Sequence, residues 1–146
     1  MSEELARKLM LQIVTPQRLL AEEQVDEVQL PGRHGYLGIL PGHAPLLTEL
    51  GVGDLKYRFG KDVYHLAIAN GFAEVLPDRV IVLAEIGERA EEIDPGRARD
   101  ALKRAEERLA MHSESGIDWE RALAALARAR VRSEVAVHGG ASADLE

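Results

Sequence analysis

The segment from Pro31 to Pro45 reads PGRHGYLGILPGHAP, and it contains four of the thirteen glycines and three of the six prolines in the chain. Proline fixes the backbone angle φ, whereas glycine permits angles that other residues avoid. Neither residue suits the interior of a helix or of a central strand. The sequence therefore predicts a rigid ribbon that turns several times around a short apolar centre, Leu37 to Leu40.

Alternating apolar residues on both sides of this ribbon predict short β-strands. Large apolar residues occupy every second position of four segments, residues 9–13, 28–30, 55–59 and 64–68. A period of two is typical of strands with one buried face. Val25 is out of phase with Val28, which predicts a bulge or bend between them. The continuous apolar run from Val80 to Leu83 predicts a strand that is buried on both faces.

Turn signals separate these strands. Gly60 to Asp62 and Pro77-Asp78 are expected to reverse the chain, and Asn70-Gly71 predicts a two-residue hairpin. Turns that recur about every 8–12 residues are typical of a β-sandwich or a β-barrel.

The pattern becomes helical after residue 94. Asp94 is a favourable N-cap and Pro95 suits the first helical position. Asp118 is expected to cap a second helix. The apolar stripes of the two helices are Ala98, Leu102, Ala105, Leu109 and His112, and Trp119, Leu123, Leu126 and Val131.

These patterns predict an α+β fold, with an antiparallel β-sandwich over residues 1–90 and an antiparallel two-helix hairpin over residues 91–137. The tail, residues 138–146, is expected to be disordered. The helices face each other largely through alanine, which buries little area at about 25 cal/mol per Å². The hairpin is therefore expected to be mobile.

Composition excludes several classes of protein. The formal net charge of −7 argues against nucleic-acid binding. The absence of cysteine excludes a disulfide, a thiolate nucleophile and a thiolate metal site. The first ten residues, MSEELARKLM, contain no long apolar run, so no secretory signal is expected. No stretch approaches the about 18 consecutive apolar residues of a spanning helix, so no direct membrane insertion is expected.

Four stretches together resemble one protein family. They are LQIVTP (11–16), VDEVQLPG (25–32), GYLGILPGHAPLL (35–47) and IDPGRA (93–98). Their order and spacing are similar to those of the epsilon subunit of bacterial F-type ATP synthase, and the resemblance extends from about Leu9 to Val137. It implies a β-sandwich followed by a helical hairpin, in agreement with the patterns above.

The resemblance also implies a function. It is that of a non-catalytic rotor subunit of the central stalk, which couples the gamma subunit to the c-ring of the proton-translocating enzyme. The mobile helices would inhibit ATP hydrolysis when they extend and reach the beta subunit. The implied location is peripheral, on the cytoplasmic face of the cell inner membrane, as part of the complex.

Residues of the turning ribbon are implied as partner contacts. By the resemblance, Arg33, His34 and Tyr36 belong to a loop that approaches the c-ring, and His43 and Leu46 lie at the gamma interface. Tyr36 departs from the family pattern, which commonly has an acidic residue at this position. An ordinary solvated turn remains the alternative for the loop.

Seven residues match positions that bind ATP in some members of the family: Glu88, Ile93, Asp94, Arg97, Ala98, Arg128 and Arg132. A helix N-terminus and convergent arginines can hold phosphates through charge-assisted hydrogen bonds. The resemblance thus implies ATP as a regulatory ligand, with no cofactor required. The alternative is that Asp94 is only an N-cap and that the arginines form a solvated face.

The second helix is basic within an acidic protein. By the resemblance, Arg121, Arg128, Arg130 and Arg132 would meet an acidic segment of the beta subunit in the inhibitory state. A merely solubilising role for these arginines is the alternative.

Two other functions compete with that of a rotor subunit. A stand-alone ATP-sensing module is the alternative, whereas a small hydrolytic enzyme is disfavoured because the sequence has no GxSxG motif and no metal-spaced cluster. His65, isolated on a strand, and His138, in the tail, are interpreted as ordinary packing or surface residues. No metal site is predicted.

Overall fold

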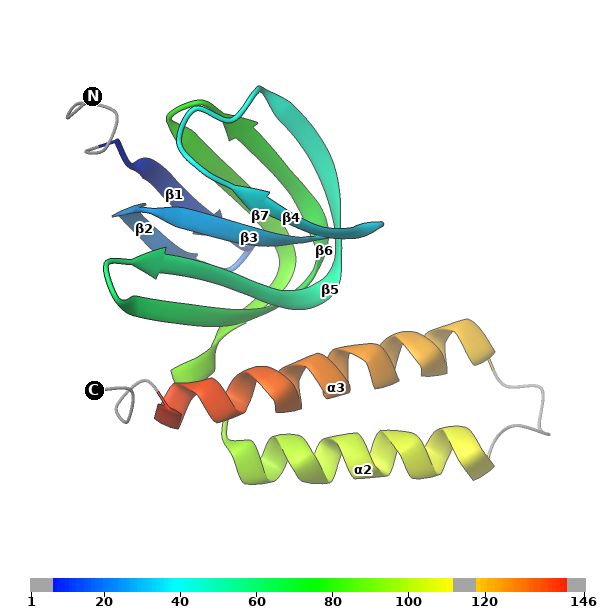
Figure 1. Ribbon diagram of the computed structural model, residues 1–146. Coiled ribbons are helices and arrows are strands. Elements are labelled where there is room, and N and C mark those ends of the chain that lie inside the picture. The colour runs from blue at the N-terminus through cyan, green and yellow to red at the C-terminus, as the bar shows by residue number, and fades with distance from the viewer. Residues whose placement is uncertain (1–6, 112–117, 142–146) are drawn as a thin grey trace.

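The computed structural model describes residues 7–111 and 118–141. Seven strands are followed by a short 3-10 helix and two α-helices (Figure 1). The elements are β1 (Leu9–Val14), β2 (Leu19–Val25), β3 (Glu27–Gly32), β4 (Gly35–Ile39), β5 (Leu46–Phe59), β6 (Asp62–Leu76), β7 (Arg79–Arg89), η1 (Ala90–Glu92), α2 (Pro95–Met111) and α3 (Trp119–Ala141). This order confirms the predicted α+β class.

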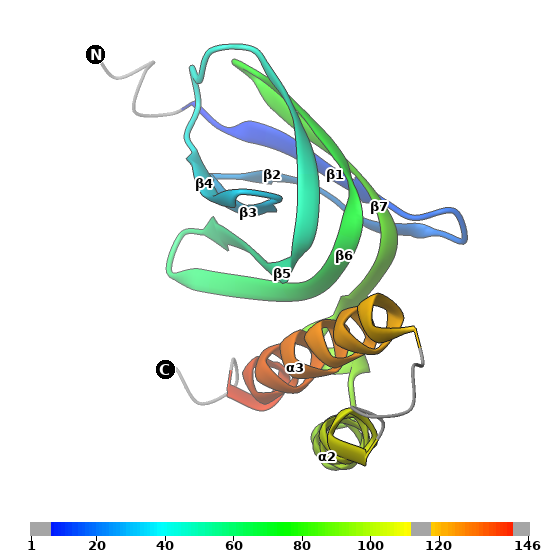
Figure 2. The ribbon, with the colours of Figure 1, turned by 90° about the vertical axis from the view of Figure 1, so that its right-hand side faces the viewer.

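The seven strands form one sheet in the order β2-β1-β7-β6-β5-β3-β4. Neighbouring strands are antiparallel, except that β1 and β7 pair in parallel. The sheet curls over on itself around one apolar core, and the long strands β5 and β6 curve strongly (Figure 2). This is the predicted sandwich. The predicted bend near Val25 is also confirmed, because β2 ends there and β3 begins at Glu27.

The Asn70-Gly71 pair does not form the predicted hairpin. Both residues lie inside β6, with φ angles of 65° and 119°. A Cβ on Gly71 would lie 2.0 Å from the carbonyl oxygen of Leu83 on β7. The pair therefore bends a continuous strand rather than ending it, because glycine and asparagine both tolerate positive φ and only glycine permits this close approach.

The apolar run in β7 is not buried on both faces, which corrects the prediction. Val80 and Val82 are fully buried, whereas Leu83 is 55% exposed. Successive side chains of a strand point to opposite faces of the sheet. Because the helices do not cover this part of β7, its second face stays open to solvent (Figure 2).

The two helices lie below the sandwich, with α3 between α2 and the β domain (Figure 2). A second, smaller core joins them and consists of Ala90, Ile93, Ala98, Val135 and Ala136. The predicted apolar stripe of the second helix is only partly buried, since Trp119 and Leu123 are 46% and 43% exposed. Among the residues described, no helix is long and apolar enough to cross a membrane.

The end of α3 also differs from the prediction. The sequence predicted a disordered tail from His138, but α3 continues to Ala141. Here the helix approaches η1 so closely that a Cβ on Gly139 would lie 2.6 Å from the carbonyl oxygen of Ala90. Packing against η1 therefore continues the helix through a sequence that contains two glycines. Residues 142–146 and His112 lie outside the described residues.

Replacing Gly71 by alanine is expected to destabilise the β domain, because the new Cβ would meet the carbonyl of Leu83. The strained backbone angle alone is expected to lower the free energy of unfolding by about 1–3 kcal/mol. Urea denaturation measures this change. The control is Gly38→Ala, because a Cβ at Gly38 would meet no atom within 4 Å. Equal losses for the two variants would contradict the role of Gly71.

Candidate functional site

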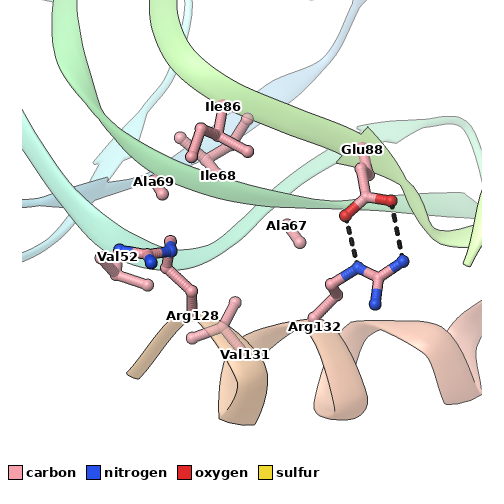
Figure 3. Close-up of a pocket in the computed structure, with 9 residues that line it drawn as sticks. All are labelled: Val52, Ala67, Ile68, Ala69, Ile86, Glu88, Arg128, Val131 and Arg132. Atoms are coloured by element: carbon pink, nitrogen blue, oxygen red, sulfur yellow. Dashed lines mark hydrogen bonds and ion pairs between the residues drawn. The ribbon is translucent and has the colours of Figure 1, made fainter. Parts of the chain in front are cut away.

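A small hollow lies where α3 faces the curved strands β5, β6 and β7 (Figure 3). Its volume is about 130 Å³. It is lined by Val52, Ala67, Ile68, Ala69, Ile86, Glu88, Arg128, Val131 and Arg132. The small side chains of Ala67 and Ala69 leave the space open on the sheet side, and two arginines of α3 enter it from the other side (Figure 3).

An ion pair crosses this hollow. Nε and Nη2 of Arg132 donate hydrogen bonds to the two carboxylate oxygens of Glu88, at 2.6 and 3.2 Å (Figure 3). These bonds to Glu88 raise the pKa of Arg132 above its usual value. Two parallel bonds between planar groups fix the orientation of both side chains. The pair therefore links α3 to β7.

The structure brings together three of the seven predicted ATP-binding residues. Glu88, Arg128 and Arg132 line the same hollow, with the two arginines one helical turn apart on α3. Figure 3 shows both arginines on the side of α3 that faces the sheet. A carboxylate and two guanidinium groups can recognise, respectively, a hydrogen-bond donor and a phosphate.

The other four predicted ATP-binding residues do not line the hollow. The carboxylate of Asp94 accepts a 3.0 Å hydrogen bond from the backbone of Arg97, which lowers the pKa of Asp94. The backbone carbonyl of Asp94 accepts a 2.9 Å bond from Ala98. Asp94 is thus the N-cap of α2, as its sequence position predicted. Ile93 and Ala98 are buried in the second core, while Arg97 is exposed.

The four arginines assigned to an inhibitory helix divide into two pairs. Arg121 and Arg130 are exposed on α3. Arg128 and Arg132 are half-buried against the β domain. In this docked arrangement, two of these four arginines therefore face the β domain and two face solvent.

The predicted c-ring loop is the tip of the β3–β4 hairpin. Arg33 and His34 are exposed there, and Arg33 forms an ion pair with Glu49 of β5. Tyr36 is also exposed, but its hydroxyl accepts a 3.0 Å hydrogen bond from the backbone of Asp54. Tyr36 therefore helps to fix the hairpin on β5, in addition to the contact role assigned to it.

The two predicted gamma contacts lie beside an apolar surface that the sequence reasoning missed. His43 is half-buried in the loop before β5, and Leu46 is half-buried against the main core. Nearby on the outer face of the sheet, Leu47, Phe72 and Leu83 are 72%, 53% and 55% exposed, and Phe72 pairs directly with Leu83. We define these three residues as the outer apolar patch. The sequence did contain a signal for this patch. Leu83 lies an odd number of positions from Val80 and Val82, so in a strand its side chain points to the opposite face of the sheet.

Family models match nearly the whole chain. The model for the beta-sandwich domain of the ATP synthase Delta/Epsilon chain matches residues 8–90. The model for the long alpha-helix domain of the same chain matches residues 91–136. The chain belongs to the ATP synthase delta/epsilon family. This confirms the resemblance that the four sequence stretches indicated.

Similar members of the delta/epsilon family are bacterial epsilon chains. The ATP synthase epsilon chain 2 of Syntrophotalea carbinolica is 48% identical over 136 residues, which are 93% of this chain and 99% of the relative. The epsilon chain of Solibacter usitatus is 52% identical over 124 residues, or 85% and 92% of the two chains. The homologues are thus the epsilon subunit of ATP synthase, a non-catalytic stalk subunit.

Solved structures share the delta/epsilon fold. A chain in the cryo-EM structure of the Euglena gracilis mitochondrial ATP synthase OSCP/F1/c-ring aligns with a TM-score of 0.74, at 24% identity over 90% of this chain and 82% of that chain. A chain of the Tetrahymena thermophila mitochondrial central stalk and c-ring aligns with a TM-score of 0.57, at 17% identity over 89% and 97%. At such identities the likeness establishes the fold alone.

A double-mutant cycle on Glu88→Ala and Arg132→Ala is expected to show that the ion pair holds α3. Because both side chains are partly exposed, water screens the pair, and a coupling energy of about 0.3–1 kcal/mol is expected. Hydrogen exchange of α3 amides measures it. Arg130→Ala, an exposed arginine on the same helix, is the control. Additive effects of the two alanine substitutions would refute the coupling.

Proposed function

We propose that this chain is a rotor subunit that couples the gamma shaft of ATP synthase to the c-ring and inhibits ATP hydrolysis through its helical hairpin. The observation that carries this proposal is the docking of α3 on a β domain that has its own separate core. Among the described residues, α3 docks through a small core, the Glu88–Arg132 ion pair and the stacking of His138 on His65. Such a hairpin can leave the β domain without unfolding it.

The energetics of docking support a hairpin with two positions. Three of the five buried residues in the second core are alanines. Apolar burial contributes about 25 cal/mol per Å², so small side chains contribute little each. The main core, in contrast, is larger and is built mainly from leucine, isoleucine and valine of all seven strands. Undocking therefore costs much less than unfolding the sandwich.

Undocking would change the charge that α3 presents. Arg132 would lose Glu88, and Arg128 would leave the hollow. Together with the exposed Arg121 and Arg130, they would form one basic helix. A basic helix fits an acidic partner surface, which in this proposal belongs to the beta subunit in the extended state.

The β domain supplies the two other contacts. We assign the exposed hairpin tip with Arg33, His34 and Tyr36 to the c-ring. We assign His43 and Leu46, extended by the outer apolar patch, to the gamma subunit, because an exposed apolar patch is typical of a protein interface. The complex would thereby hold this subunit at the cytoplasmic face of the cell inner membrane.

ATP is proposed as a regulatory ligand, on the observation that Glu88, Arg128 and Arg132 converge on one hollow. The volume of about 130 Å³ is smaller than the about 300–1,000 Å³ of typical ligand pockets. A nucleotide would therefore have to break the Glu88–Arg132 pair and widen the gap between α3 and the sheet. Its phosphates would then replace Glu88 as the partner of the arginines.

Deleting residues 95–146 is expected to leave assembly with gamma and the c-ring intact and to raise ATP hydrolysis, because the inhibitory helices are removed. Allosteric couplings are typically 1–3 kcal/mol, so a rise of about fivefold or more is expected. The steady-state hydrolysis rate of the reconstituted complex measures it. A deletion of residues 142–146 alone is the control. Unchanged hydrolysis with the truncated subunit bound would count against inhibition.

Calorimetric titration of the full chain with ATP is expected to release heat, and Arg128→Ala and Arg132→Ala are each expected to weaken binding at least about tenfold. A hydrogen bond to a charged group contributes roughly 1.5–3 kcal/mol. Arg130→Ala, whose side chain is outside the hollow, is the control and should bind as the parent does. The absence of heat at millimolar ATP would refute the proposal that ATP binds, but it would not contradict the proposed rotor function.

A further inference from the structure

A second cluster of polar side chains crosses the junction about two helical turns beyond Arg132. Asp54 of β5, His65 of β6 and His138 of α3 each place one oxygen or nitrogen within 4.8 Å of the others. Nδ1 of His65 lies 2.7 Å from Oδ2 of Asp54. The rings of His65 and His138 stack, with centroids 3.7 Å apart and planes 7° from parallel.

Packing alone does not account for this cluster. In the part of the chain that the structure describes, Oδ1 of Asp54 is buried and has no hydrogen-bond partner. Such an atom normally costs free energy unless a partner satisfies it. In addition, Nδ1 of His65 and Oδ2 of Asp54 share one proton across 2.7 Å, and a metal ion can replace that proton and bind both residues. Two imidazoles and a spare carboxylate oxygen form a donor set that suits a transition-metal ion.

We propose that Asp54, His65 and His138 bind Zn²⁺ and thereby link the end of α3 to the sheet. Zinc takes nitrogen and oxygen ligands at about 2.0–2.2 Å, and water can supply the fourth ligand. Ligand atoms around a tetrahedral zinc ion lie about 3.3–3.6 Å from each other. The three atoms here lie within 4.8 Å of one another, so the side chains must move closer to bind one ion.

Binding requires a small rearrangement. The lone pair of an imidazole nitrogen lies in the plane of its ring, so two parallel rings cannot both direct a lone pair at one ion. One ring must therefore rotate out of the stack, and His138 is the freer of the two because Asp54 already holds His65. Burial and the neighbouring His65 lower the pKa of His138.

The site would act on the position of the hairpin. Two of its ligands belong to the β domain and one to α3, so only the docked arrangement offers all three. A ligand that binds one state at 100 times its Kd favours that state about 100-fold. Zinc would therefore hold the hairpin down. This inference depends on the three side chains and not on the proposed role in ATP hydrolysis.

The test uses the full chain without a histidine tag, titrated with Zn²⁺ against a competing chelator. We expect one ion to bind per chain. His65→Gln and His138→Gln should each weaken binding by at least about 10–100-fold, the loss found even for outer partners of zinc ligands. Asp54→Asn, which keeps the size of the side chain, should weaken it similarly while circular dichroism shows an unchanged fold.

The control is His43→Gln, a half-buried histidine outside the cluster, and this variant should bind zinc as the parent does. A second readout is hydrogen exchange in the last turns of α3, which zinc should slow by up to about 100-fold in the parent and leave unchanged in His138→Gln. Equal zinc affinity in the parent and in His138→Gln would overturn the proposal, as would exchange in α3 that zinc does not slow.

Discussion

The docking of α3 on the β domain depends on the small size of the residues where they meet. Val135 and Ala136 pack against Ala90, and Gly139 passes so close to the carbonyl of Ala90 that a side chain there would clash. Small residues let the backbones approach, but they bury little apolar area. The same feature therefore permits the contact and keeps it weak.

A weak apolar contact gives polar groups at the junction a large influence. The β domain has its own core, separate from the small core that holds the helices. In the function proposed above, the position of the hairpin is a separate equilibrium, in which a shift of 1.4 kcal/mol changes the populations about tenfold. The Glu88–Arg132 pair and the cluster that contains His138 lie on this boundary. They are the places where a ligand or an ion can act on the hairpin.

The sequence predicted the elements whose signals are local. Alternating apolar residues located β1, and Asp94 located the start of α2, because strand period and N-capping depend only on near neighbours in the chain. The failures involve partners. Asn70-Gly71 is a hairpin signal in isolation, but two neighbouring strands hold it inside β6. Likewise, the exposure of Leu83 depends on which surface the helices leave uncovered.

The sequence by itself determined the family, the division into strands followed by helices, and many core residues. Four short stretches, among them the turning ribbon of residues 31–45 and the motif at residues 93–98, indicated the family, and alternating apolar residues indicated the core. Only the tertiary structure decided that Arg132 meets Glu88, that Ile93 is buried, and that His65 stacks on His138. The physical reason is that the residues that meet in each case lie far apart along the chain. The curvature of the sheet and the close approach of α3 bring them together, and no short stretch of sequence predicts which residues will meet.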